Sequence, residues 1–69
     1  MPVISVQEIR EMKKEDRLRR LEELRSELAR LKAQAARGTL ENPARIKEIK
    51  RAIARILTVE REEKMRASR

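Results

Sequence analysis

The sequence contains no aromatic residue, no cysteine and no histidine. Without Phe, Tyr or Trp, it lacks the rings on which unpaired nucleic-acid bases stack, and it lacks the largest core-filling side chains. The absence of cysteine excludes disulfides and thiolate metal sites, and without histidine only carboxylates could bind a metal. The residue types that remain do not supply the paired nucleophile and base that catalysis needs. We therefore expect no enzyme, no metal, no cofactor and no small-molecule substrate.

Long apolar runs are also missing. No run approaches the 18 residues of a transmembrane helix, and the first residues lack the apolar core of a signal peptide. We therefore expect neither a membrane-spanning nor a secreted segment. Glycine occurs once and proline twice, so few positions of the chain favour a break in a helix.

Positive charge is in excess. Nineteen Lys and Arg residues against twelve Asp and Glu residues give a net charge of +7 on 69 residues. That excess favours a phosphate-rich partner or an anionic surface. The alternative is a soluble helical protein with many surface ion pairs, since 45% charged residues is also typical of long exposed helices. A chain of this length is a single unit with a small core, which favours a component of an assembly.

The periodicity predicts an all-α chain. A short helix is expected over about 6–12, because Ser5 and Glu8 form a capping box and Ile4 and Ile9 a hydrophobic staple. A long helix is expected over about 15–36 and a second over about 43–65. The turn between them spans 37–42, and 66–69 form a solvated tail. All of 1–69 belongs to one unit.

Each long helix has one apolar line of residues with alternating steps of three and four, the spacing of a coiled-coil seam. The first seam is Leu21, Leu24, Leu28, Leu31 and Ala35, preceded by Leu18, and the second is Ile46, Ile49, Ile53 and Ile56. Gly38 can end the first helix in the left-handed conformation, and Asn42-Pro43 can begin the next. The short turn predicts an antiparallel two-helix hairpin, a short coiled coil, with the short N-terminal helix near its open end.

Basic residues follow the side of the second long helix opposite its seam. Lys47, Arg51 and Arg55 are spaced by four and share one face. Arginine can bond two phosphate oxygens at once, so this face suits the backbone of structured RNA, although a merely solvated surface is the alternative. A second basic cluster lies between the short helix and the first long one. The predicted RNA-binding residues are Lys13, Lys14, Arg17, Arg20, Arg37, Arg45, Lys47, Lys50, Arg51 and Arg55.

Two stretches resemble a known family. The run 34–40, QAARGTL, leads into 42–56, NPARIKEIKRAIARI, in which KRAIARI is the most specific part. Similar residues extend through EIREM and ELRSELARLK over nearly the whole chain. Together they resemble the universal large-subunit ribosomal protein family twenty-nine, the counterpart of the eukaryotic thirty-five protein. The ending ILTVERE is similar to archaeal members.

The resemblance implies a helical hairpin that is a structural constituent of the large ribosomal subunit. It implies binding to large-subunit rRNA near the mouth of the polypeptide exit tunnel, beside ribosomal protein family twenty-three, where nascent-chain targeting factors dock. It places Lys50, Arg51 and Arg55 among the RNA-binding residues. The expected location is therefore cytoplasmic and ribosome-bound, without a membrane partner.

Two other functions remain open at this point. The apolar seams could pair two hairpins into a four-helix bundle, giving a free-standing dimeric nucleic-acid-binding regulator. An amphipathic helix lying on a membrane surface is the other alternative, but the Trp and Phe anchors of such helices are missing.

Overall fold

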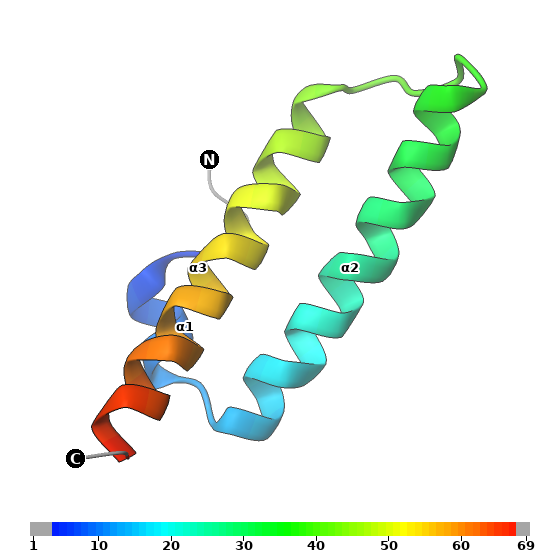
Figure 1. Ribbon diagram of the computed structural model, residues 1–69. Helices are drawn as coiled ribbons and strands as arrows, with labels where there is room; N and C mark the ends of the chain where they lie inside the picture. Colours follow the sequence, from blue (N-terminus) through cyan, green and yellow to red (C-terminus); the bar gives the residue numbers. More distant parts are fainter. Residues whose placement is uncertain (1–3, 68–69) are drawn as a thin grey trace.

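The computed structural model describes residues 4–67, which form three helices: α1 (Val6–Glu11), α2 (Lys14–Ala36) and α3 (Ala44–Ala67). Helices α2 and α3 run antiparallel side by side, and α1 packs against α3 near the open end of the hairpin (Figure 1). The molecule extends 48 × 20 × 16 Å. The predicted all-α hairpin with a short N-terminal helix is confirmed. Within residues 4–67, no helix is both long and apolar enough to cross a membrane.

Local signals in the sequence set the helix ends. The Oγ of Ser5 accepts a hydrogen bond from the N–H of Glu8 at 3.2 Å, which is one half of the predicted capping box. Gly38 has a φ of +73° after the last turn of α2. The N–H of Thr39 donates to the carbonyl of Gln34, and the N–H of Gly38 donates to that of Ala35, so the helix ends in a Schellman motif. The chain then reverses within a few residues.

The core is wider than the two predicted seams. Leu21, Leu24 and Leu31 of α2 are buried, as are Ile49 and Ile56 of α3. Ala52 and Val59, which lie beside the predicted seam of α3, are also almost completely buried. Steps of three and four place these two residues on one side of Ile56, where α1 packs against α3. On the other side Ile53 is only half-buried, because no helix within residues 4–67 covers it.

Helix α3 continues to Ala67, through residues 66 and 67 of the expected tail; residues 68–69 lie outside the described part. The apolar spacing stops after Val59, but three glutamates beyond it bind arginines from other helices. Glu62 pairs with Arg10 of α1 at 3.2 Å, and Glu60 and Glu63 both pair with Arg17 of α2. Ion pairs rather than apolar contacts therefore connect the end of α3 to the rest of the protein.

Candidate nucleic-acid interface

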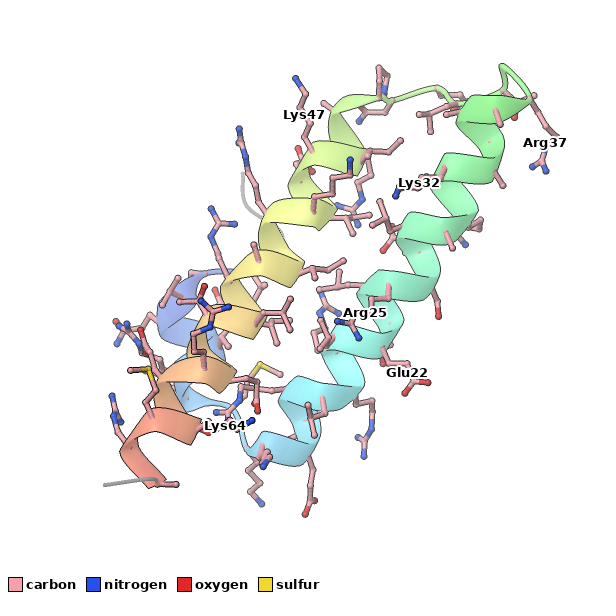
Figure 2. The ribbon with its side chains drawn as sticks, viewed as in Figure 1. Glu22, Arg25, Lys32, Arg37, Lys47 and Lys64 are labelled. Atoms are coloured by element: carbon pink, nitrogen blue, oxygen red, sulfur yellow. The ribbon has the colours of Figure 1, made fainter. Side chains whose placement is uncertain are left out.

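The side of α3 that faces neither α1 nor α2 is the best candidate site, and we call it the outer face of α3. Its exposed residues include Lys47, Lys50, Arg51 and Arg61, separated by the small side chain of Ala54. In Figure 2, Lys47 points away from α2 into solvent. None of these four cations forms an ion pair with another residue of the 4–67 segment. All four are therefore available to an anion.

The outer face carries no competing negative charge, because the glutamates of α3 form ion pairs with arginines outside this face. Each of the four is half-buried and forms an ion pair with an arginine. Glu48 pairs with Arg45 at 3.6 Å, and Glu62 pairs with Arg10. Glu60 and Glu63 pair with Arg17. The exposed ionisable residues of the outer face are consequently all basic, and each glutamate of α3 is paired with an arginine rather than with one of them.

Arg55 borders this face but is half-buried. Its Nη1 atom is covered by protein and has no hydrogen-bond partner within the described residues. A buried donor without an acceptor costs free energy. Arg55 therefore gains a hydrogen bond if its side chain turns outward to an acceptor on the outer face.

The prediction for Arg17 is wrong, because its side chain is only 2% exposed. The guanidinium donates through Nε to Glu60 at 2.7 Å, through Nη1 to the carbonyl of Met12 at 3.0 Å, and through Nη2 to Glu63. Burial alone lowers its pKa, but the hydrogen bonds and charges of Glu60 and Glu63 outweigh burial and raise the pKa above its ordinary value. Arg17 therefore joins α2 to α3 and cannot contact RNA in this conformation.

Two other predicted residues are engaged with neighbouring glutamates. Arg45 is half-buried, and its Nη2 lies 3.2 Å from Glu27 of α2. Arg20 lies 3.7 Å from Glu23, and its Nε atom is buried without a partner in residues 4–67. An RNA phosphate would have to compete with these carboxylates, so both residues are weaker candidates than those on the outer face.

The remaining predicted residues are exposed but lie at opposite ends of the hairpin. Arg37 is at the turn, while Lys13 and Lys14 are at the start of α2, where Lys14 borders the end of α3. The molecule is 48 Å long, so these ends do not form one compact site with the middle of α3. Among the predicted residues, the structure brings together Lys47, Lys50 and Arg51, with Arg55 beside them.

Arg61 is the cation of this face that sequence reasoning missed. It lies seven residues after Ala54 and three after Thr58, so the same periodicity that groups Lys47 with Arg51 includes it. The helix expected over about 43–65 already included Arg61, but the basic stripe was followed only as far as Arg55, because the apolar spacing disappears after Val59. In the structure α3 continues through this segment, and Arg61 lies exposed on the outer face.

Comparison with known proteins agrees with this architecture. The family model described as Ribosomal L29 protein matches residues 7–62. The large ribosomal subunit protein uL29 of Staphylothermus marinus is 64% identical, over 90% of this chain and 92% of the relative. The proteins of the same name from Pyrobaculum aerophilum and Haloarcula marismortui are each 52% identical, over 88% and 91% of this chain and 81% and 90% of their own lengths. The chain therefore belongs to the ribosomal L29 protein family, in its archaeal type.

Proposed function

We propose that the outer face of α3 binds the phosphate backbone of large-subunit rRNA. Membership of the L29 family makes the chain a structural constituent of the large ribosomal subunit, ribosome-bound in the cytoplasm and not an enzyme. What carries the proposal is one observation: the exposed ionisable residues of the outer face are all basic, since the four glutamates of α3 are held in internal ion pairs. Solvated surface helices ordinarily mix charges of both signs.

The chemistry of this face suits a duplex backbone rather than bases. Arg51 and Arg61 each present a planar guanidinium that can bond two phosphate oxygens, while Lys47 and Lys50 act as point charges. Ala54 leaves the helix surface low between them, so that a sugar-phosphate strand can come close to the backbone. The hydroxyl of Thr58 donates to the carbonyl of Ala54 at 2.8 Å and keeps its oxygen as an acceptor for a ribose hydroxyl.

Arg55 contributes to the same face when its side chain turns outward. A phosphate oxygen supplies the acceptor that its buried Nη1 lacks within residues 4–67, so binding removes an unsatisfied donor as well as adding an ion pair. The exposed ends, Lys13, Lys14 and Arg37, extend the contact along the length of the hairpin. We do not include Arg17, because its guanidinium is already occupied by two carboxylates.

The position within the subunit is part of the proposal. The family resemblance of residues 42–56 supports a place near the mouth of the polypeptide exit tunnel, beside ribosomal protein family twenty-three. The exposed surface of α2 is then free for nascent-chain targeting factors. Chemical cross-linking of intact large subunits, with lysine-reactive reagents and mass spectrometry, tests this placement: the expected links join this chain to the family twenty-three protein. Reproducible links only to proteins far from the tunnel mouth would refute it.

Binding to purified large-subunit rRNA tests the outer face directly. We expect the Lys47→Glu, Arg51→Glu double variant to weaken binding, and to reduce the slope of log affinity against log salt by about one unit for each lost phosphate contact. The matched control is Arg25→Glu with Lys32→Glu, which reverses the same charge on exposed residues of α2. Equal losses in the two variants would mean that only net charge matters. Unchanged binding in the first would leave the outer face as solvated surface.

The alternative function, a free-standing dimeric regulator, predicts a different oligomeric state. Such a protein would be a stable dimer in isolation, with its seams buried between the two copies. Sedimentation equilibrium of the isolated chain gives its mass: we expect a monomer, because the seams already pack within one hairpin. A stable dimer without affinity for rRNA would favour the regulator.

A further inference from the structure

The hairpin has a second uncovered surface, on the side of α2 and α3 opposite α1, which we call the open face. Helix α1 covers one side of the hairpin through Ala52 and Val59, and no helix of the described chain covers the other. Two large apolar side chains are exposed on it, Leu18 at 44% and Leu57 at 42%. Beside them, Leu28 and Ile53 are only half-buried. The core of the hairpin is therefore incomplete on this side.

Each helix contributes an i, i+7 series to the open face. The series on α2 is Leu18, Arg25 and Lys32, and the series on α3 is Lys50, Leu57 and Lys64. Residues seven apart lie nearly above one another on a helix. In Figure 2, Arg25, Lys32 and Lys64 lie over the space between the two helices, whereas Glu22 points away from α3. Neither series contains an acidic residue. Toward the open end Glu60 and Glu63 line the same depression as Lys14, Arg61 and Lys64, so the open face is apolar and basic on its turn side.

The helix register places the two leucines at similar heights. Arg17 pairs with Glu60 across the hairpin, which sets these residues at similar heights. Leu18 follows Arg17, and Leu57 lies three residues before Glu60 in the antiparallel helix, so both are displaced toward the turn by less than one helical turn. Leu18 and Leu57 therefore lie at similar heights on the two helices, and both are exposed on the open face. Arg25 and Lys50 lie on the turn side of this pair, and Lys14 and Arg61 on its open-end side.

We infer that the open face binds an amphipathic protein helix whose apolar stripe is flanked by acidic residues. An apolar centre with a charged rim is the usual anatomy of a protein interface. An amphipathic helix laid between α2 and α3 would cover Leu18 and Leu57 and complete the burial of Leu28 and Ile53. Its flanking carboxylates would face Arg25, Lys32 and Lys50. This inference goes beyond the proposed function, because it concerns a different class of partner and a face that shares only Lys50 and Arg61, at their common border, with the outer face of α3.

Two other occupants fit less well. A second copy of this chain would bring the same cations to the same face, and like charges brought together oppose association. Nucleic acid would match the cations but would leave the two exposed leucines without an apolar partner, since a sugar-phosphate backbone offers none. The outer face of α3, by contrast, presents cations around Ala54 and suits a backbone. The two faces therefore favour partners of different chemistry.

Synthetic peptides test the inference on the intact chain. The probe is a helix about three heptads long, with Leu at positions a and d and Glu at positions e and g. We expect it to bind with a dissociation constant on the order of micromolar, as measured by isothermal titration calorimetry. Two control peptides keep the same length: one replaces each Glu with Lys, and the other replaces each Leu with Gln. Neither should bind measurably.

Variants of the protein locate the binding site. Arg25→Glu with Lys32→Glu should weaken acidic-peptide binding at least about tenfold and confer binding of the Lys peptide, because the rim charge is reversed. Leu18→Gln with Leu57→Gln should weaken it similarly; both side chains are exposed, so helicity by circular dichroism should not change. Lys47→Glu with Arg51→Glu should retain peptide affinity within about threefold, since these residues lie on the outer face.

The opposite pattern would overturn the inference. Absence of acidic-peptide binding to the native chain, or equal affinity in the native and Arg25→Glu, Lys32→Glu proteins, would show that the open face does not accept this partner. If the same variant lost more rRNA affinity than Lys47→Glu with Arg51→Glu, the open face would be a nucleic-acid surface instead. Loss of rRNA binding by the outer-face variant alone supports the proposed function whatever the peptides do.

Discussion

The ion pairs of Arg17 allow a quantitative prediction, because one guanidinium connects α2 to the last two turns of α3. Its side chain is 2% exposed, whereas Glu60 is 20% and Glu63 42% exposed. Removing one partner of a fully buried pair costs about 3–5 kcal/mol, since the other charge is left buried. Exposed pairs contribute about 0–1 kcal/mol.

The stability loss expected for the Arg17→Met variant lies between these two limits. Methionine keeps most of the apolar contacts of the side chain, so the change removes chiefly the two ion pairs and the hydrogen bond to the carbonyl of Met12. Glu63 and part of Glu60 regain water, which reduces the penalty. We expect a loss of about 2–4 kcal/mol in the free energy of unfolding. Adding Glu60→Gln and Glu63→Gln to this variant should recover part of the loss, because no carboxylate then remains unpaired.

Urea unfolding followed by far-ultraviolet circular dichroism measures this difference. The matched control is Arg19→Met, two residues along α2, whose pair with Asp16 spans 3.7 Å between side chains that are 71% and 51% exposed. That control should cost less than about 1 kcal/mol. A loss for Arg17→Met no larger than that of Arg19→Met would refute the reasoning, and apolar contacts alone would then hold the end of α3.

Two further substitutions test the fold. Ile56→Ala should cost about 2–5 kcal/mol in urea unfolding because Ile56 is fully buried, while Leu57→Ala, next to it but 42% exposed, should cost far less; similar losses would mean that the face of α3 is assigned wrongly. Gly38→Ala should lower the free energy of unfolding by about 1 kcal/mol, since φ is +73° there although nothing lies within 4 Å of the new Cβ. A smaller loss in Gly38→Asn than in Gly38→Ala would agree with backbone conformation as the cause, and no loss in either would contradict it.

Local and periodic signals were sufficient to predict the hairpin. The isoleucine and leucine spacing predicted which helix faces meet, and Gly38 predicted where α2 ends, because both depend on residues close in sequence. The burial of Ala52 and Val59 was not predicted. It depends on α1 packing beside the seam, and a small residue such as alanine gives no signal of which side of a helix will be covered.

The candidate site was predicted where charge and helix periodicity coincide, as at Lys47 and Arg51. Arg17 was misjudged because basic residues are normally exposed, and the two carboxylates that pair with it lie 43 and 46 residues later in the chain. Arg61 was missed for a different reason: the basic stripe was followed only as far as Arg55, although helix periodicity places Arg61 on the same face.

Sedimentation of the tagged chain in cell extract, across a series of salt concentrations, tests the central claim most directly. We expect the native chain to migrate with the large ribosomal subunit and to remain bound at moderate salt. The Lys47→Glu, Arg51→Glu variant, checked for unchanged helicity, should dissociate at distinctly lower salt, because the outer face of α3 supplies the phosphate contacts. Dissociation of both proteins at the same salt concentration would contradict the role of this face, and a small free species at every salt concentration would contradict the rRNA-binding function itself.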